Sequence, residues 1–310
     1  MSETDETVWT DILHPDTVGA FGRGLVDRAQ RAQLFHTGLG PWDDSCDDTG
    51  GGLDDFWYVV CTGASNVGKT QLGLALAQRA LRQDFAVVFL TLEEPADQIM
   101  RRMYAAISDV NYYDFTYARF NEECIARLVE STPYLGKFIV NDELSSSDLP
   151  TIFEYLDEAR DMLFGRPLVV IFDHLQLVKV ERGENIGQAA TEVSEGLRRW
   201  AKQNRTLTIA FSQLTSEVIR DGRPPRAWDM YGGSAMYSNA SQVVVIDHTA
   251  KVADTLEPWK IRMWAMLDKN RYGQKLVAMP VEANLKSGLW RCPLPDEHHL
   301  WQPNPWERKR

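Results

Sequence analysis

The sequence predicts an α/β domain with a mostly parallel, twisted β-sheet that is covered by helices on both faces. Two observations lead to this fold class. Short, continuously apolar runs alternate with longer segments of helical pattern, and a glycine-rich loop joins the first run to the helical segment after it. Strands buried on both faces read as unbroken apolar runs, whereas half-solvated strands alternate. At 310 residues and 44% hydrophobic content, the chain can bury such a core.

The first expected element is an amphipathic helix over residues 16–36. Its apolar residues recur at three- and four-residue spacing, and Asp16 is placed to cap its N-terminus. Glycines within it weaken the helix by roughly 1 kcal/mol each relative to alanine, so it needs a surface on which to dock. The residues alone leave two alternatives open, which are packing on its own domain and docking on a neighbouring subunit.

The remaining elements alternate along the chain. Further helices are expected over 71–82, 149–162 and 189–203. The expected strands are 56–61, 86–91, 138–141, 168–172, 207–211, 243–247, 262–267 and 275–281. The last of these strands is expected to end the sheet, and residues 301–310 are expected to form a loosely held tail.

Composition argues against several classes of protein. No run of eighteen uncharged apolar residues indicates a membrane span, and the acidic N-terminus lacks the features of a secretory signal. The four cysteines are scattered, which favours reduced thiols in a cytoplasm over a zinc site or a disulfide framework. Of the net charge of −11, residues 1–60 carry −9, from twelve acidic and three basic residues. The other residues carry only −2, so the overall acidity does not exclude nucleic-acid binding.

The most informative pattern is the loop at 63–70, G-A-S-N-V-G-K-T. Two glycines separated by four residues and followed by Lys-Thr fit a loop that cradles nucleotide phosphates with backbone N–H groups. Lys69 would reach the terminal phosphates, and the hydroxyl of Thr70 would hold Mg²⁺. The residues expected to bind the nucleotide are Gly63, Ala64, Ser65, Asn66, Val67, Gly68, Lys69, Thr70 and Gln71.

Polar residues at the ends of three other expected strands supply further parts of a nucleotide-hydrolysing site. Asp173 ends an apolar strand and is the expected second group that orients Mg²⁺. Glu93 and Glu94 follow another strand at the sheet edge where ligands collect, as a polariser of the attacking water or as a solvated helix start. Gln213 closes a further strand, where it can sense the γ-phosphate or serve as an ordinary polar residue.

Lys269 and Arg271 follow a later expected strand. Two residues that are two apart on an extended segment point to the same side. The pair is therefore either a solvated basic turn or a pair of cations that reaches one phosphate group, across a subunit boundary, as an arginine finger does.

Together these motifs resemble the C-terminal ATPase domain of DnaB-type hexameric replicative helicases, a RecA-like P-loop NTPase core. The matching segments, spread from about residue 37 to residue 289, are T-G-L and D-D-T-G-G-G-L within 37–53, the loop at 63–70, F-L-T-L-E-E-P-A-D-Q-I at 89–99, D-H-L-Q-L at 173–177, E-V-S-E-G-L-R-R-W-A-K at 192–202, S-Q-L at 212–214 and K-N-R-Y-G at 269–273. His174 stands where the family has Tyr. The resemblance divides the chain into an acidic N-terminal segment with a linker-type helix (1–36), the ATPase domain (37–290) and a C-terminal tail (291–310).

The resemblance also implies roles, cofactors and partners. The implied roles are phosphate binding by Lys69, Mg²⁺ binding by Thr70 and Asp173, activation of water by Glu93, sensing by Gln213, and action in trans on the neighbour's nucleotide by Lys269 and Arg271. The implied cofactors are ATP and Mg²⁺. The implied partners are single-stranded DNA and further copies of the chain in a hexameric ring, working in the cytoplasm without a membrane.

Two departures from the family pattern stand out. Only about 36 residues precede the match, so the family's N-terminal domain, which contacts primase, has no room, and a primase contact is in doubt. The family's DNA-contacting loop reads Asp-Leu-Arg-x-Ser-Gly, whereas Tyr231 replaces the Arg here. Backbone N–H groups and base stacking can still hold DNA, and nearby arginines add charge, although loop arginines are often simply solvated. The residues expected to contact DNA are Arg220, Arg223, Arg226, Tyr231, Gly232, Gly233 and Ser234.

The leading hypothesis is therefore an ATP-driven helicase or translocase on single-stranded DNA that acts in DNA replication. An alternative is a RecA-fold ATPase that acts as a loader, remodeller or regulatory switch without processive unwinding. A third reading, an inactive structural homologue, conflicts with the intact set of site residues.

Overall fold

The computed structural model describes residues 33–117, 119–146, 148–163, 166–177, 186–249, 251–254 and 257–307. Residues 34–310 form one compact unit. Most of the helix predicted over 16–36 lies outside the described residues. Its predicted end is wrong, because Phe35 is extended and exchanges backbone hydrogen bonds of 2.9 and 2.8 Å with Leu53.

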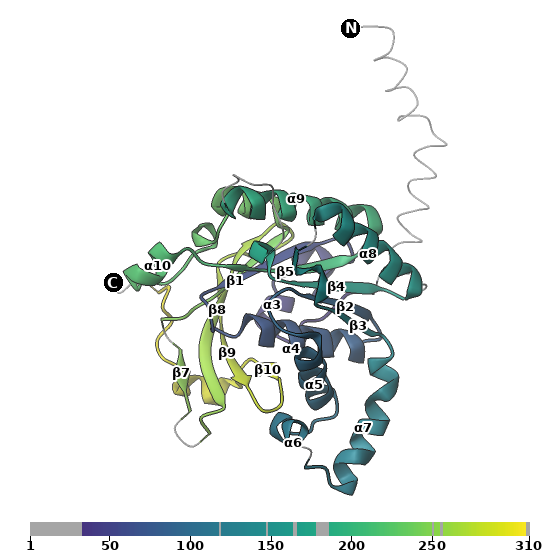
Figure 1. The fold of residues 1–310 in the computed structure, drawn as a ribbon. Coiled ribbons are helices and arrows are strands. Elements are labelled where there is room, and N and C mark those ends of the chain that lie inside the picture. Colours follow the sequence, from purple (N-terminus) through teal and green to yellow (C-terminus); the bar gives the residue numbers. More distant parts are fainter. Residues whose placement is uncertain are drawn as a thin grey trace, which may run out of the picture. The chain divides into compact units, whose positions relative to one another are not determined.

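The unit is built on one ten-stranded mixed sheet (Figure 1). The strands are β1 (Tyr58–Gly63), β2 (Ala86–Thr91), β3 (Phe138–Asn141), β4 (Leu168–Asp173), β5 (Leu207–Gln213), β6 (Gln242–Ile246), β7 (Val252–Ala253), β8 (Lys260–Asn270), β9 (Val277–Asn284) and β10 (Trp290–Arg291). Their order is β10-β9-β8-β6-β1-β5-β4-β2-β3, with β7 beside β8. The half from β6 to β3 is parallel, and the other half is antiparallel.

This architecture confirms the predicted fold class of a mostly parallel sheet with helices on both faces. The prediction that the strand at 275–281 ends the sheet is wrong, because the two-residue strand β10 pairs with β9 beyond it. A strand of two residues carries too little apolar pattern to be read from a sequence.

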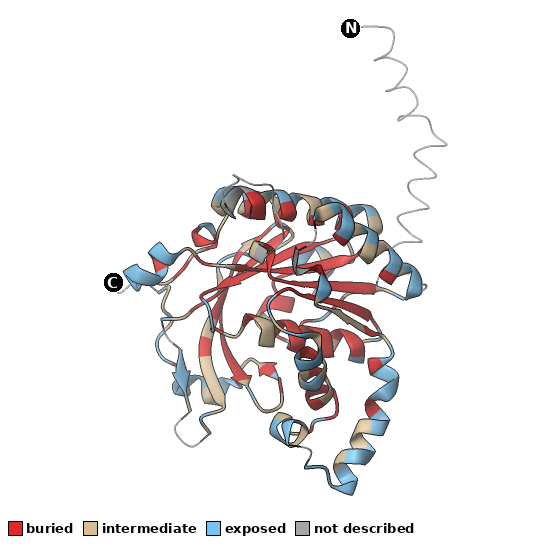
Figure 2. Ribbon diagram, viewed as in Figure 1, coloured by how far each residue is buried: buried red, intermediate tan, exposed pale blue. Residues whose placement is uncertain are grey.

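Helices cover both faces of the sheet. The helices are α3 (Gly40–Asp43), α4 (Lys69–Arg82), α5 (Ala96–Ile107), α6 (Tyr112–Thr116), α7 (Glu122–Leu135), α8 (Leu149–Met162), α9 (Ile186–Asn204), α10 (Ser216–Asp221) and α11 (Gly233–Asn239), with 3₁₀ turns at Asp47–Thr49, Glu143–Ser146, Leu175–Leu177, Ala227–Asp229 and Pro295–Leu300. Buried side chains of α4 and α5 pack on one face, and those of α8, α9 and α11 pack on the other. The buried residues therefore form two layers, one on each side of the sheet (Figure 2).

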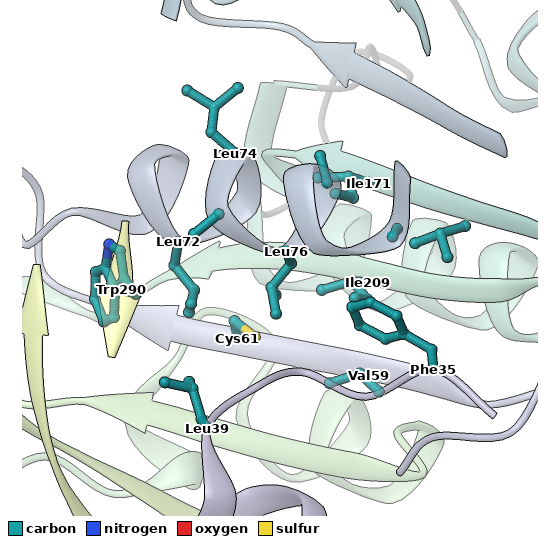
Figure 3. Packing of buried hydrophobic residues seen from close by; sticks show 14 of the residues in the cluster. Phe35, Leu39, Val59, Cys61, Leu72, Leu74, Leu76, Ile171, Ile209 and Trp290 are labelled. Atoms are coloured by element: carbon teal, nitrogen blue, oxygen red, sulfur yellow. The ribbon is translucent and has the colours of Figure 1, made fainter. Parts of the chain in front are cut away.

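Successive side chains of β1 belong alternately to the two buried layers. Val59 and Cys61 belong to the layer beneath α4, whereas Tyr58 and Val60 belong to the opposite layer. Successive side chains of a strand point to opposite faces, so a strand buried on both faces must be apolar throughout. Figure 3 shows Leu72 of α4 pointing toward the strand that carries Cys61. This packing fixes α4, and therefore the loop before it, against the sheet.

The end of the chain is held more firmly than the sequence predicts. Trp301 is 8% exposed, and its Nε1–H donates to the backbone carbonyls of Met263 at 3.0 Å and Val281 at 3.2 Å. The indole of Trp306 donates to the carbonyl of Pro225 at 2.8 Å. The expected loose tail is therefore wrong for these two positions. Within the described ranges, no helix has both the length and the apolar character to cross a membrane.

Candidate nucleotide-hydrolysis site

The glycine-rich loop joins the end of β1 to the first residue of α4. Gly68 has φ +105° and Asn66 has φ 60°, conformations in which a residue without a Cβ, or a short polar one, is favoured. A Cβ at Gly63 would lie 2.7 Å from the side chain of Val67, so this glycine is also required for packing. The loop therefore leads straight into the first turn of α4, where the N–H groups have no partner within the helix.

Lys69 lies folded over this loop. Its Nζ donates to the carbonyl oxygens of Gly63 at 3.1 Å and Ala64 at 2.8 Å, and the side chain is buried. Burial lowers the pKa of Lys69, and the carboxylates of Asp173 and Glu93 partly oppose that shift. A phosphate is a stronger partner for an ammonium than a carbonyl is, so the same Nζ is placed to exchange its loop contacts for a triphosphate.

Thr70 and Asp173 meet at the ends of α4 and β4. The hydroxyl of Thr70 donates to Oδ2 of Asp173 at 2.6 Å. Asp173 is 2% exposed, and burial raises its pKa to about 6 although Thr70 and Lys69 oppose the rise. A buried carboxylate beside a hydroxyl is a pair of hard oxygen donors, which suits Mg²⁺ when phosphate oxygens and water complete its shell. These two residues therefore fit the predicted magnesium site.

The two glutamates after β2 have different surroundings. Both oxygens of Glu94 pair with Arg102, at 3.0 and 2.8 Å. The side chain of Glu93 is 61% exposed, and its Oε2 lies 3.3 Å from Nδ1 of His174. Because the charge of Glu94 is already balanced by a cation, Glu93 is the carboxylate that is available to polarise water. The geometry supports the predicted choice of Glu93 over its neighbour.

Gln213 ends β5 next to His174. Its side-chain nitrogen lies 3.0 Å from Nε2 of His174. Its backbone also ties it to the following loop, because its carbonyl accepts from the N–H of Tyr231 at 3.1 Å. Burial, with a contribution from Lys69, lowers the pKa of His174 to about 4, so this imidazole is neutral at physiological pH.

Apart from His174, the groups described above border a cavity of about 370 Å³. One end is formed by the loop and the polar residues of β2, β4 and β5. The other end is formed by α5, α6 and the turn after β9, with Arg102, Tyr112, Tyr113, Leu285, Lys286 and Gly288. The backbone N–H of Tyr112 donates to the carbonyl of Lys286 at 3.1 Å, which joins the two sides of this wall.

No sequence motif predicts this second wall. The one signal for it was the N-L-K-S-G turn at 284–288, where Asn284 and Gly288 (φ +72°) are residues typical of tight turns. Nothing in the sequence says that this turn meets α6.

Lys269 and Arg271 do not line the cavity of their own chain. Both donate to backbone carbonyls at the C-terminal end of α11, Lys269 to Tyr237 and Ser238 and Arg271 to Ser238. The two side chains therefore reach the same place, as their spacing predicts. Burial and the charge of Arg271 lower the pKa of Lys269 to about 8.

The residues between and after these cations face the other way. Asn270 donates to the carbonyl of Ser45 at 2.7 Å, and the ring of Tyr272 stacks on Trp57 with centroids 4.5 Å apart. A Cβ at Gly273 would lie 2.0 Å from the carbonyl oxygen of Ser45, so only glycine fits there. The segment thus has one side that packs on the core and one side that carries the cations.

The predicted DNA-contacting residues separate into two groups. Gly232 (φ +78°) and Gly233 (φ +37°) open α11 next to Tyr231, and Ser234 is exposed. Arg220 is also exposed, at α10. In contrast, Arg223 and Arg226 are paired with carboxylates of this chain, although the side chain of Arg223 is 45% exposed.

Each of these two arginines is bound to a buried carboxylate. Arg223 donates to both oxygens of Asp229, at 2.7 and 2.6 Å, and Nε of Arg226 donates to Asp268 at 2.9 Å. Trp228, which no sequence motif marks, is 53% exposed, with the guanidinium of Arg226 4.7 Å from the centroid of its ring.

Comparisons with known proteins assign most of this chain to one family. The family model described as the DnaB-like helicase C terminal domain matches residues 41–282. A probable plasmid replicative DNA helicase of Chlamydia psittaci is 24% identical over 221 residues, which cover 70% of this chain and 47% of the relative. The replicative DNA helicase DnaB of Buchnera aphidicola (Acyrthosiphon pisum strain) is 29% identical over 202 residues, which cover 63% of this chain and 43% of the relative. The chain thus spans under half the length of these relatives.

Solved structures support the same fold. The ATPase domain of G40P superposes with a TM-score of 0.73 at 16% identity and covers 90% of this chain and 98% of its own. A DnaB-like replicative helicase, solved in a study of its interactions with primase, gives 0.71 at 17% identity, covering 89% of this chain and 66% of its own. At these identities the likeness concerns the fold.

Proposed function

This chain belongs to the family of DnaB-like helicase C-terminal domains, and on that premise we propose that it is the ATP-hydrolysing motor of a replicative DNA helicase. In this proposal the chain couples ATP hydrolysis, with Mg²⁺, to movement along single-stranded DNA in a ring of identical subunits, a hexamer. The observation that carries the proposal is the convergence of Lys69, Thr70, Asp173, Glu93 and Gln213 on one cavity. The loader or switch alternative draws no support from the relatives, which are named as replicative helicases.

Binding of the triphosphate would begin at the loop. The Lys69 ammonium would leave the carbonyls of Gly63 and Ala64 for the terminal phosphates, and the N–H groups of the first turn of α4 would add partial positive charge. Thr70 and Asp173 would hold Mg²⁺, which neutralises charge on the phosphates. The base and ribose would then lie toward the second wall, near Tyr113 and Lys286.

Hydrolysis would use the remaining polar residues. Glu93 would accept a proton from the attacking water, because it is exposed to the cavity and its neighbour Glu94 is occupied by Arg102. Gln213 would contact the γ-phosphate and pass its presence to the loop through the hydrogen bond from the Tyr231 N–H. That loop would hold DNA through the backbone of Gly232 to Ser234.

Lys269 and Arg271 would complete the site of a neighbouring subunit. They do not line their own cavity, and they contact backbone carbonyls at the end of α11, where Lys269 also lies 4.7 Å from the centroid of the Tyr237 ring. A phosphate of the neighbour's nucleotide would be a stronger partner for both cations. Such a finger lowers the barrier by stabilising charge that develops on the transferred phosphoryl group.

Assembly would also use apolar surface on α7. Ile125 and Val129 are four residues apart on one helix face and are 52% and 67% exposed. We propose that residues 16–32 of a neighbouring copy, the part of the expected amphipathic helix that precedes the described residues, cover this face. The proposal rests on the apolar spacing of that segment in the sequence.

Unwinding and assembly assays test the proposal. We expect the purified chain to unwind a forked duplex when ATP and Mg²⁺ are present, and its native mass to correspond to a ring. Val129→Asp should reduce the native mass without unfolding the monomer. Glu130→Gln, at an adjacent position of α7, should leave the native mass unchanged. A monomeric protein that hydrolyses ATP at full rate without any DNA effect would contradict the proposal.

A further inference from the structure

His174 lies between two groups of the proposed site without bordering the cavity itself. It follows Asp173 at the end of β4 and is 3% exposed. One ring nitrogen faces Gln213 and the other faces Glu93. Both of those residues line the cavity, so the imidazole forms a bridge behind it.

The contacts assign a direction to this bridge. The side-chain nitrogen of Gln213, 3.0 Å from Nε2, carries only donors, so Nε2 must be the acceptor. A neutral imidazole with an accepting Nε2 carries its proton on Nδ1. That N–H is buried and makes no hydrogen bond in this structure, and the carboxylate oxygen Oε2 of Glu93 lies 3.3 Å from Nδ1. Gln213 therefore donates to His174, and the unpaired Nδ1–H of His174 is a donor within reach of Glu93.

We propose that His174 is a positioning residue that links the γ-phosphate sensor Gln213 to the water-activating carboxylate Glu93. The proposal rests on the function proposed above and deepens it. The amide group of Gln213 has two N–H donors, so one can hold His174 while the other meets a phosphate. Any movement of Gln213 toward a phosphate then shifts the ring that orients Glu93.

The imidazole is suited to this task in a way that the family's tyrosine is not. Imidazole has a nitrogen on each side of the ring, whereas the tyrosine ring has a single oxygen at its far end. Glu93 depends on such help because its side chain is 61% exposed and, within the described ranges, it has no partner among the lysines and arginines at ion-pair distance. Histidine at 174 is therefore a feature of this chain that the family pattern does not explain.

Two substitutions separate the halves of the bridge. In His174→Asn the amide nitrogen can stand near the position of Nδ1, so the contact to Glu93 can persist while the contact to Gln213 is lost. In His174→Gln the amide can reach the position of Nε2, which keeps Gln213 and loses Glu93. We expect each variant of the full chain to bind ATP with Mg²⁺ within about threefold of the natural affinity. We expect each to slow single-turnover hydrolysis by about ten- to a hundredfold, because a misplaced catalytic group costs rate rather than binding.

Either variant hydrolysing at the natural rate would overturn the proposal, as would a loss of affinity equal to the loss of rate. Nitrogen-15 NMR of histidine-labelled protein gives a readout that does not depend on activity, with the resonance of residue 174 assigned by its absence in His174→Asn. We expect the proton on Nδ1, and a change in the tautomer signal in Gln213→Ala. A proton on Nε2 would overturn the proposal even if the protein proves to be an active helicase. If the protein shows the expected tautomer but has no ATPase activity, the proposed function is wrong, whereas the assignment of the proton to Nδ1 stands.

Discussion

The nucleotide edge of the sheet and the loop around Tyr231 differ in how far their motif residues are free to bind a ligand. At the nucleotide edge, Asp173, Glu93 and Gln213 lie at or just after the ends of neighbouring strands and border one cavity. Around the loop, Arg223 and Arg226 are bound to Asp229 and Asp268. A strand end fixes where its residues project, whereas a run of loop arginines predicts charge without predicting what the charge binds.

The largest effect should come from Lys69→Ala. Removing the ammonium takes away the only side-chain cation of the glycine-rich loop, so we expect ATP hydrolysis to fall by at least about a hundredfold. The measurement is the steady-state rate of phosphate release. Lys202→Ala, at an exposed position of α9, is the matched control and should leave the rate unchanged. Normal turnover in Lys69→Ala would show that the glycine-rich loop does not take part in ATP hydrolysis as proposed.

Arg271→Ala should impair hydrolysis almost as strongly while leaving nucleotide binding intact. The side chain does not line its own cavity, and fingers of this kind stabilise the charge that develops on the transferred phosphoryl group. Mixing Lys69→Ala with Arg271→Ala subunits should restore part of the rate, because each supplies what the other lacks. If the mixture stays inactive although both variants assemble together, action in trans is wrong.

Asp173→Asn should weaken the binding of ATP with Mg²⁺ but stabilise the Mg²⁺-free fold. Burial raises the pKa of Asp173 to about 6, above its ordinary value of 3.8, so the folded state holds a proton that the unfolded chain releases between those values. Stability without Mg²⁺ therefore falls as the pH rises through this window. At pH 8 the substitution should raise the free energy of unfolding of the Mg²⁺-free protein by about 1–3 kcal/mol.

At pH 3.5 the two proteins should unfold at nearly the same denaturant concentration, because the aspartate is then protonated in the folded state and mostly protonated in the unfolded state. In the natural protein, affinity for ATP with Mg²⁺ should decline as the pH falls below about 6. An equal stability of the two proteins at pH 8 would show that the carboxylate is not penalised by burial.

The smallest effects should separate the arginines near the loop. Arg223→Ala should lower the free energy of unfolding by about 1–2 kcal/mol, because the buried carboxylate of Asp229 loses its cation. Arg220→Ala should leave stability unchanged, weaken single-stranded DNA binding by a few fold at all sequences, and reduce the salt dependence of that binding by about one counterion. Denaturant melts and fluorescence anisotropy in a salt series measure the two quantities. The reverse pattern would mean that Arg223, not Arg220, contacts DNA.

The parts of the fold that follow from local pattern could be predicted from the sequence. β4 is an unbroken apolar run, and its final aspartate is positioned by the strand itself, so both the element and Asp173 could be read directly. The helix α8 begins and ends where its apolar spacing indicates. Such features depend on neighbouring residues, which a sequence displays.

The parts that depend on contacts between distant segments could not be predicted. The pairing of Arg226 with Asp268 joins residues 42 positions apart. The strand β10 is recognisable only through its partner β9, and the second wall of the cavity exists only because the turn at 284–288 meets α6. The role of His174 likewise appears only when Gln213 and Glu93 are seen on either side of it.

The most direct test of the proposed motor is the rate of ATP hydrolysis by the full chain with Mg²⁺, measured with and without single-stranded DNA and with Lys69→Ala in parallel. We expect a low basal rate, a clear increase on adding DNA, and no DNA-dependent rate in Lys69→Ala. A natural protein whose ATPase rate is the same with and without DNA would contradict the proposal that this chain is a helicase motor.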